Sequence, residues 1–201
     1  MALQTKVKIS NVTNLSDARY CAGMGVDMLG FVIDDKSENY ISSQKLKDIR
    51  AWVSGVKIVV EVETLDTGFL EIIGKYNPDV IQVNNIELLQ KIKLANDKPL
   101  ILSIEANQDA DTIFGICEKH SDLVDYFLLE SHKETTLSGD WPDFLTLLSN
   151  QFNILLGFGV TPQNVLSLPC AGIALRGSQE ERPGYKNFDD LRDILELLEE
   201  N

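Results

Sequence analysis

Charged and polar side chains recur where short apolar segments of the sequence end. In KISNVT, Lys8 and Ser10 stand two residues apart, and residues two apart on a β-strand point to the same face. The same spacing gives three further pairs: Gln82 with Asn84, Ser103 with Glu105, and Leu128 with Glu130. A lone charge, Glu61 in VVEV, ends another such segment. If these strands lie in parallel, their ends form one mouth that holds one cation and three carboxylates, and a carboxylate there could serve as a general acid.

Ser10 stands where such a strand would deliver a catalytic side chain, yet a serine hydroxyl is a poor proton acceptor. Its pKa lies far above the value of about 8.5 that is ordinary for a thiol, so Ser10 needs a partner to act as a general base. The carboxylates also have a purely structural explanation. In that alternative, Glu61 or Glu105 pairs with Lys8 or lies at the rim of the mouth.

Glycines gather in the last quarter of the sequence and suggest a place for a phosphate group. LLGFGVTPQNV puts Gly157 and Gly159 after one strand, with a helix predicted directly beyond. ALRGS adds Arg176, Gly177 and Ser178 after the next strand. Backbone N–H groups and a helix N-terminus attract anions, and the loops after the seventh and eighth strands are the usual phosphate site of a parallel barrel. The alternative is that these glycines serve tight turns alone.

Short β-rich segments alternate with helical patterns along the whole chain. We predict strands at 6–12, 27–33, 56–62, 79–83, 99–104, 124–129, 153–157 and 171–176. We predict helices at 15–24, 42–54, 65–76, 86–95, 108–119, 141–149, 162–167 and 187–200. Eight β-then-α units without a break in composition indicate an α/β fold, a compact (βα)8 TIM barrel that forms a single domain over residues 1–201. Asn14 or Ser16 would cap the first helix, and Thr161 followed by Pro162 would begin the seventh.

The balance of charges limits the classes of partner. The chain has 201 residues, a net charge of −13 and a pI near 4.5. Such a surface repels nucleic acid and anionic membranes, and no cluster of lysine and arginine offsets it, so we expect neither as a partner. No apolar run approaches the roughly 18–20 residues that span a bilayer, and the first residues lack the apolar region of a signal peptide. We therefore expect a cytoplasmic protein.

The cysteines and histidines are scattered. Cys21, Cys117 and Cys170 show no metal-ligand spacing and are typical of small buried side chains in a reducing compartment, so we expect no metal site. His120 in CEKHSD is typical of a helix end, where a cation is favoured. His132 follows Glu130 by two positions and could face the mouth.

The motifs, taken in order, resemble those of the phosphoribosylanthranilate isomerases of tryptophan biosynthesis. KISNVTNLSDA resembles the family's K-I-C-G-I-T-N-x-x-D-A, and GFVIDDKSENYIS resembles G-F-x-F-x-x-K-S-x-R-Y-V/I. IQVNN resembles Q-L-H-G, LLE resembles L-L-D, and DW resembles F-D-W. GFGVTPQNV resembles G-G-L-x-P-x-N-V, and PGYKNFDDL resembles P-G-x-K-D. The resemblance covers nearly the whole chain and implies a small (βα)8 barrel.

The resemblance also implies an activity. Members of the family convert N-(5-phosphoribosyl)anthranilate to the aminoketose phosphate, an Amadori rearrangement that needs no cofactor. A cysteine after the first strand is the general base and an aspartate after the sixth is the general acid; this chain has Ser10 and Glu130 at those positions. Asn39 replaces a substrate-binding arginine, Asn84 replaces the histidine of Q-L-H-G, and Leu175-Arg176 replaces paired serines.

Together the spacing and the resemblance give a set of candidate site residues. The candidate catalytic groups are Glu130 and Ser10, and the candidate substrate pocket comprises Lys8, Asn39, Glu61, Gln82, Asn84 and Glu105. The candidate phosphate site comprises Gly157, Gly159, Arg176, Gly177 and Ser178. We expect a phosphorylated small-molecule ligand and a monomer or homodimer.

Two functions of different classes remain open at the level of sequence. The first is an isomerase-family enzyme, with Glu130 as acid and a substitute base among Glu61, Glu105 and His132, acting on the family substrate or on another sugar phosphate. The second is a catalytically silent or repurposed barrel that binds a phosphorylated metabolite or a protein partner. A purely structural scaffold would require an exposed apolar patch, which sequence alone does not reveal.

Overall fold

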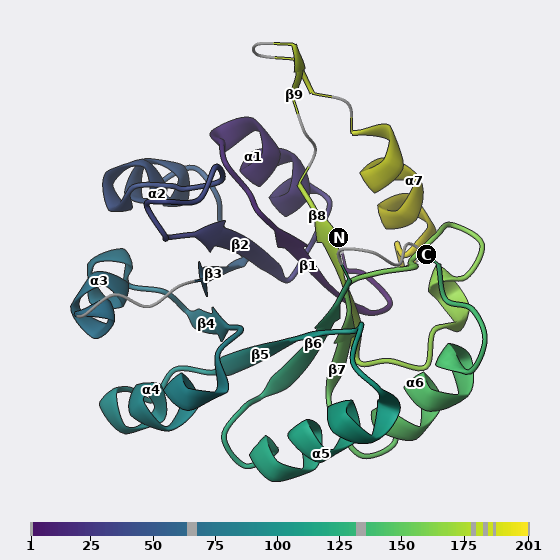
Figure 1. The fold of residues 1–201 in the computed structure, drawn as a ribbon. Helices are drawn as coiled ribbons and strands as arrows, with labels where there is room; N and C mark the ends of the chain where they lie inside the picture. The colour runs from purple at the N-terminus through teal and green to yellow at the C-terminus, as the bar shows by residue number, and fades with distance from the viewer. Residues whose placement is uncertain are drawn as a thin grey trace.

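Eight parallel strands close into a barrel in the computed structural model, which describes residues 2–63, 68–131, 136–177, 180–182, 185–186 and 188–200 (Figure 1). The strands are β1 (Lys6–Ser10), β2 (Met28–Val32), β3 (Lys57–Val62), β4 (Val80–Val83), β5 (Leu100–Glu105), β6 (Tyr126–Glu130), β7 (Ile154–Leu156) and β8 (Gly172–Arg176). Each strand pairs with the next in the chain, and β8 pairs with β1 to complete the ring. The predicted (βα)8 barrel is confirmed, and each predicted strand overlaps an observed one.

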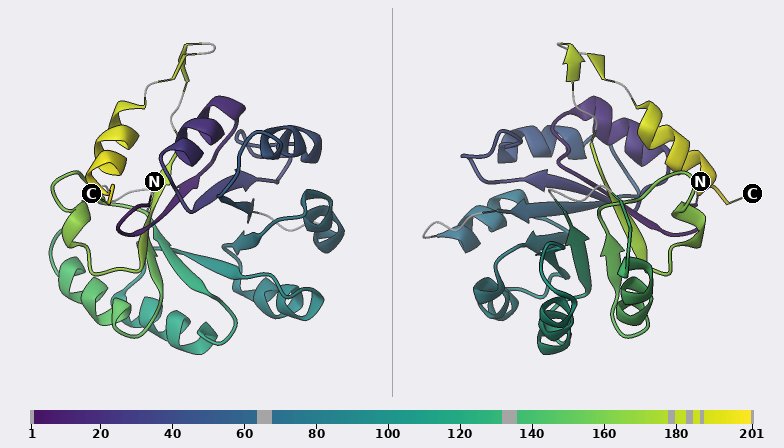
Figure 2. Two further views of the ribbon diagram at one scale, coloured as in Figure 1. Left: turned by 180° about the vertical axis from the view of Figure 1, so that it is seen from behind. Right: turned by 45° about the vertical axis from the view of Figure 1, so that its right-hand side comes forward.

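Helices surround the strands on the outside of the barrel (Figure 2). They are α1 (Leu15–Gly23), α2 (Ser43–Arg50), α3 (Phe69–Tyr76), α4 (Leu89–Ala95), α5 (Ala110–His120), α6 (Trp141–Ser149) and α7 (Asp189–Leu197), with short 3-10 turns η1 (Ile86–Leu88) and η2 (Val165–Ser167). Of the two predicted caps, Asn14 and Ser16, it is Asn14 that caps α1: its side chain accepts a hydrogen bond from the Asp17 backbone N–H. A small antiparallel hairpin, β9 (Glu180–Arg182) and β10 (Tyr185–Lys186), projects from the barrel between β8 and α7 (Figure 1).

The helix predicted at residues 162–167 is wrong. Only the three residues of η2 turn in a 3-10 conformation there. The Asn164 side chain accepts a hydrogen bond from the Thr161 backbone N–H and donates one to the Gly159 carbonyl, both at 2.8 Å. These bonds hold residues 159–164 in a turn, so Thr161 and Pro162 do not begin an α-helix.

The strands bury both of their faces, and the two faces pack in different layers. Val7 and Ile9 on β1 face the outer core beneath the helices, as their spacing predicts. The inward face fills the barrel with one apolar layer, made of Met28, Val59, Val80, Ile101, Leu128, Leu155 and Ala174. Lys8 points into the same interior and is fully buried. The apolar layer closes the lower barrel, so the polar residues beyond it lie at the C-terminal end of the strands.

A repeated aspartate joins neighbouring strands in pairs. Asp27, Asp79 and Asp125 each stand one residue before an even-numbered strand. Their side chains accept hydrogen bonds of 2.8–2.9 Å from backbone N–H groups at the start of the preceding strand, those of Val7, Ile58 and Leu100. The repeat fixes the alignment of β1 with β2, β3 with β4 and β5 with β6. Among the described residues no helix is long and apolar enough to cross a membrane.

Replacing Asp27 with alanine should destabilise the fold by about 1–2 kcal/mol, because the Val7 N–H loses its acceptor in a partly buried place. Urea unfolding would measure the change, with Asp122→Ala, at an exposed position, as the control. Equal free energies of unfolding for the two variants would show that the repeated aspartates do not hold the strands.

We expect the stability of the fold to depend on pH through His120, at the end of α5. Burial, with a smaller contribution from the Lys119 charge, lowers the pKa of His120 below 6.5. The unfolded chain then binds more protons than the folded chain below pH 6.5, so this stabilisation is present above pH 6.5 and is lost as pH falls through the folded-state pKa. Urea unfolding from pH 7.5 to 5 should therefore show a smaller loss of stability in His120→Gln than in the wild type; parallel losses would contradict this prediction.

Candidate functional site

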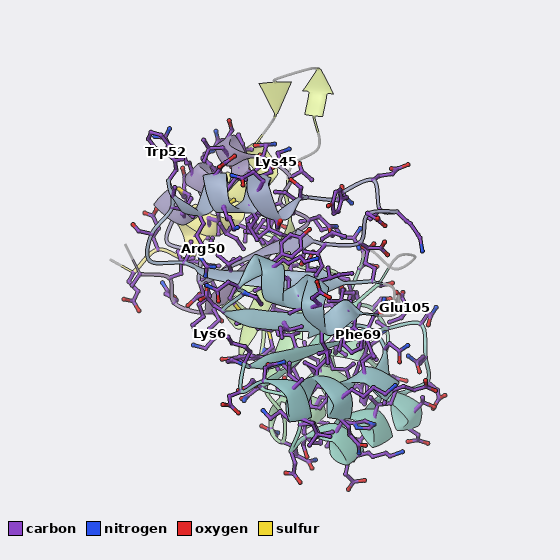
Figure 3. All side chains as sticks on the ribbon, turned by 90° about the vertical axis from the view of Figure 1, so that its left-hand side faces the viewer. Lys6, Lys45, Arg50, Trp52, Phe69 and Glu105 are labelled. Atoms are coloured by element: carbon purple, nitrogen blue, oxygen red, sulfur yellow. The ribbon has the colours of Figure 1, made fainter. Side chains whose placement is uncertain are left out.

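A cavity of about 700 Å³ opens at the C-terminal end of the barrel strands. Figure 3 shows Lys6, which begins β1, and Glu105, which ends β5, on opposite sides of the molecule. The cavity is lined on the Glu105 side by eight of the predicted site residues: Ser10, Asn39, Glu61, Gln82, Asn84, Glu105, Glu130 and Arg176. The strand ends therefore bring together six side chains that their positions predicted would meet: Ser10, Glu61, Gln82, Asn84, Glu105 and Glu130. Asn39, selected by the resemblance, and Arg176, selected for the phosphate site, line the same cavity.

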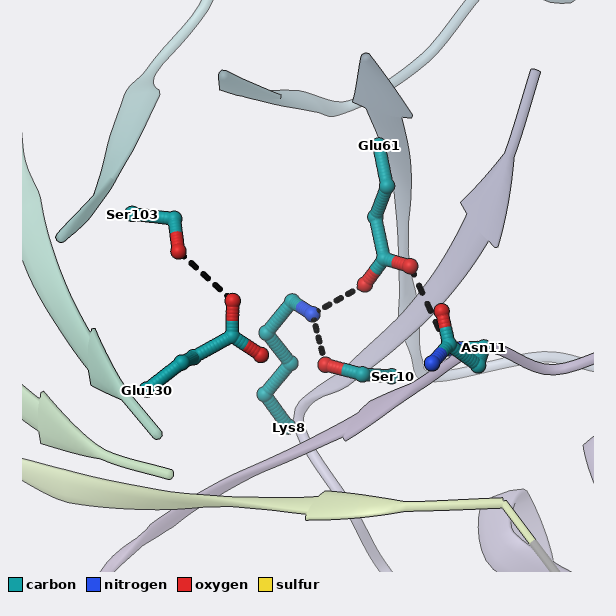
Figure 4. Close-up of polar contacts among 6 residues, drawn as sticks. All are labelled: Lys8, Ser10, Asn11, Glu61, Ser103 and Glu130. Atoms are coloured by element: carbon teal, nitrogen blue, oxygen red, sulfur yellow. Dashed lines mark hydrogen bonds and ion pairs between the residues drawn. The ribbon is translucent and has the colours of Figure 1, made fainter. Parts of the chain in front are cut away.

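Lys8 lies directly beneath the mouth, in a hydrogen-bonded group with three neighbours (Figure 4). Its ammonium group donates to Ser10 Oγ at 2.5 Å and forms an ion pair with Glu61 Oε1. The other Glu61 oxygen, Oε2, accepts from the backbone N–H of Asn11 at 3.2 Å. Lys8 is 0% exposed and Glu61 is 3% exposed, so each charge depends on the other for compensation. The pairing of Glu61 with Lys8, one of the alternatives open from sequence, is confirmed, and the mouth nevertheless stays open.

Gly30 on β2 leaves the space that this ion pair occupies. A Cβ atom at Gly30 would lie 2.0 Å from Glu61 Oε1 and 2.9 Å from Lys8 Nζ. Both atoms are buried and hydrogen-bonded, so neither can move aside cheaply. Only glycine at this position is compatible with the pair as it stands.

Glu130 reaches the cavity from the end of β6 and is held by a serine. Ser103 Oγ, on β5, donates to Glu130 Oε2 at 2.6 Å (Figure 4). Gly157, after β7, gives Glu130 its room: a Cβ there would lie 3.1 Å from Glu130 Cγ and 2.9 Å from the Leu129 carbonyl oxygen. Glu105 is the register partner of Glu130 on β5, so two carboxylates stand side by side at this edge of the mouth.

Gln82 is the most enclosed of the amide side chains that line the cavity. It is 8% exposed, and it stands on β4 in register with Glu61 on β3. Its Oε1 atom is buried, and among the described residues it has no hydrogen-bond partner. A buried amide oxygen without a donor is uncommon in folded proteins, and at a cavity wall it is ready to accept a hydrogen bond from a ligand or water.

The predicted phosphate site has fewer available backbone N–H donors than the sequence suggested. The Gly157 N–H donates to the Leu129 carbonyl and the Gly177 N–H to the Ser10 carbonyl, both at 2.8 Å, so neither is free for an anion. Gly159 has a positive φ of 64° and packs closely against Leu137. Because the three-residue turn η2 replaces the helix expected at 162–167, that helix does not supply an N-terminal dipole for an anion. Arg176 lines the cavity; Ser178 and His132 lie outside the described residues.

The structure adds polar groups that sequence reasoning did not select. Asn11 has a φ of 58°, a left-handed conformation that asparagine tolerates well, and this turns its N–H toward Glu61. Ser103 was paired with Glu105 by spacing, but its bond to Glu130 depends on the stagger between β5 and β6. Glu63 and Gln108 also line the cavity. The Asn residue directly after a strand was a usable signal for the turn at Asn11; nothing in the sequence indicated its contact.

The described cysteines do not supply a substitute base. Burial raises the pKa of the Cys117 thiol to about 12, and it also raises that of Cys170. Cys21 is fully buried within α1. None of the three lines the cavity.

Gly30→Ala should destabilise the protein by about 2–3 kcal/mol, because the added methyl group overlaps the ion pair. In a protein that already carries Glu61→Ala, adding Gly30→Ala should lower the free energy of unfolding by less than about 1 kcal/mol, since the overlapping carboxylate is gone. Gly115→Ala is the matched control: nothing lies within 4 Å of its Cβ position, so it should be neutral or slightly stabilising. Denaturant unfolding of the three single variants and the double variant measures these free energies. If Gly30→Ala destabilises the Glu61→Ala protein as much as it destabilises the wild type, the predicted overlap is refuted.

Comparison with known proteins agrees with the architecture. The family model of N-(5'-phosphoribosyl)anthranilate (PRA) isomerase matches residues 7–197. The N-(5'-phosphoribosyl)anthranilate isomerase of Aquifex aeolicus is 26% identical over an alignment of 205 positions that covers 94% of this chain and 96% of that protein.

Two solved structures share the fold. One is a phosphoribosyl anthranilate isomerase in complex with reduced 1-(o-carboxyphenylamino)-1-deoxyribulose 5-phosphate, with a TM-score of 0.75 and 23% identity over 96% of this chain and 98% of that one. The other is a monomer generated from the dimeric enzyme of Thermotoga maritima, with a TM-score of 0.76 and 22% identity over the same shares of the two chains. With a family model that spans almost all of its residues, the chain belongs to the N-(5'-phosphoribosyl)anthranilate isomerase family.

Proposed function

We propose that this protein isomerises an N-glycosidic aminoaldose phosphate to the aminoketose phosphate, with Glu130 as the general acid. The observation that carries the proposal is the position of Glu130. Its carboxyl group lines an open cavity at the end of β6, is oriented by Ser103, and lies in register with a second carboxylate, Glu105. An acid and a base side by side are what a rearrangement by two proton transfers requires.

We assign the base to Glu105, which lines the cavity and stands in register with Glu130. Glu61 is assigned to the buried ion pair, because its two oxygens accept hydrogen bonds from Lys8 and from the Asn11 N–H. In the proposed reaction Glu130 gives its proton to the ring oxygen as the C1–O bond breaks, and the nitrogen lone pair forms the C=N bond. Glu105 then takes the proton from C2; the C2–H electron pair forms the C1=C2 bond of the enamine, and the π pair of the C=N bond returns to nitrogen. Return of a proton to C1 and loss of the C2 hydroxyl proton give the ketose.

The remaining features of the ligand and the assembly follow from the same proposal. Arg176, at the wall formed by β8, supplies a fixed positive charge for the phosphate of the ligand. The solved relatives include a dimer that was converted to monomers, and we propose a monomer or homodimer for this protein. We further propose that it acts in the cytoplasm as a single domain.

Glu130→Gln should lower kcat for N-(5-phosphoribosyl)anthranilate about a hundredfold or more, because it removes the acid and keeps the shape. The fluorescence of the substrate gives the rate directly. Glu118→Gln, on the exposed face of α5, is the matched control and should keep the wild-type rate.

Ser103→Ala should reduce kcat less, by about tenfold, since Glu130 keeps its carboxyl group and loses only its orienting partner. A wild-type protein that does not turn over the substrate, or a Glu130→Gln variant as fast as the wild type, would contradict the proposed reaction.

The competing function is a barrel that binds a phosphorylated metabolite without converting it. The observation in its favour is that Ser10, at the position of the family's base, accepts a hydrogen bond from Lys8, and among the described residues no carboxylate or imidazole is bonded to its hydroxyl group. Binding of a sugar phosphate without turnover would select this function over the isomerase.

A further inference from the structure

Lys8 determines whether the hydroxyl group of Ser10 acts as a hydrogen-bond donor or as an acceptor toward the cavity. An ammonium group carries three donors and no acceptor, so Ser10 Oγ is the acceptor in the 2.5 Å bond between them. The hydroxyl hydrogen of Ser10 is therefore left to be donated elsewhere. Among the residues that the structure describes, Lys8 is the hydrogen-bond partner of Ser10 Oγ.

The cavity is where that hydrogen can go. Ser10 is 3% exposed and lines the cavity wall above Lys8. Glu61, the other neighbour of the ammonium group, is held by Lys8 and by the Asn11 N–H. The ion pair of Lys8 and Glu61 is closely packed, since it fills the space that a side chain at Gly30 would occupy. Ser10 thus presents a donor to the mouth from a fixed position.

The charge on Lys8 makes this donor stronger than an isolated hydroxyl. A hydroxyl that accepts a hydrogen bond from a cation is polarised and donates more strongly, most of all where water is excluded. Gln82 offers the complementary group, a buried amide oxygen that lacks a donor on the wall of the same cavity. A ligand that fits both must carry an oxygen acceptor and a hydroxyl donor.

We propose that Ser10 donates a hydrogen bond to the carbonyl oxygen of an open-chain sugar phosphate, while Gln82 Oε1 accepts one from a hydroxyl group of the same ligand. Lys8 and Glu61 are positioning residues in this arrangement, because they act through Ser10. The inference rests on the proposed function for the identity of the ligand as a sugar phosphate. Ser10 keeps its proton throughout, a role opposite to that of a general base.

Binding of ribulose 5-phosphate, measured by isothermal titration calorimetry, tests the assignment without turnover. Ser10→Ala should weaken the Kd about tenfold, because it deletes the donor. Ser10→Thr keeps the hydroxyl group and should bind within threefold of the wild type. Ser10→Cys should bind as weakly as Ser10→Ala, because a thiol is a poor donor. Gln82→Leu should also weaken binding, and thermal melts of each variant establish that it is folded.

Three results would overturn the proposal: no binding of ribulose 5-phosphate to the wild type, a Kd for Ser10→Ala within twofold of the wild type, or unweakened binding by Ser10→Cys. The kcat of Ser10→Cys is a separate measurement, in which a donor role and a base role for residue 10 predict changes in opposite directions. A donor role predicts that Ser10→Cys has a lower kcat for N-(5-phosphoribosyl)anthranilate than the wild type, and a rise would overturn it by identifying a base position. If ribulose 5-phosphate binding depends on the Ser10 hydroxyl and the wild type is inactive, the proposed isomerisation fails and the donor assignment stands.

Discussion

The burial of one ammonium group constrains the whole mouth of this barrel. Lys8 is fully enclosed, and an uncompensated charge in such a place costs several kcal/mol. Glu61 compensates it from β3, Gly30 leaves the space on β2, and the left-handed turn at Asn11 aims an N–H at the second carboxylate oxygen. The ion pair and the Asn11 bond therefore join β1 to β3 across β2 at the point where the cavity begins.

The buried ion pair also makes the two halves of the mouth differ in how their polar side chains are hydrogen-bonded. Near β1 and β3 the carboxylate of Glu61 is occupied, and Ser10 is left as a donor. Near β5 and β6, Glu105 and Glu130 lie in register, with Ser103 orienting Glu130. Membership of the family establishes the barrel, but chemistry depends on the groups at the site. In the proposed reaction, proton transfer takes place in the second half of the mouth and the ligand is polarised in the first.

Sequence predicted the features that depend on strand periodicity. Alternation along a strand sent Lys8, Glu61 and Gln82 inward, and the run of eight units required a closed barrel. Contacts that depend on the spacing of backbone groups between elements were not accessible. The Asn164 side chain stops a helix that Thr161 and Pro162 would otherwise begin. The amides of Gly157 and Gly177 bond to neighbouring strands, so the predicted phosphate cradle is reduced. Sequence left open whether Glu61 or Glu105 pairs with Lys8, because that choice depends on the space between strands: Gly30 on β2 leaves the room in which Glu61 on β3 reaches Lys8 on β1.

The most direct test of the central claim is the coupling free energy between Lys8 and Glu61, from urea unfolding of Lys8→Met, Glu61→Gln and the double variant. If the two charges are one buried unit, each single change should be strongly destabilising, by about 3–5 kcal/mol for Lys8→Met, because it leaves the partner uncompensated. The double variant should then be more stable than the sum of the single changes requires, by about 2–3 kcal/mol. Additive effects would mean that the two residues contribute independently, and the mouth would not depend on their pairing.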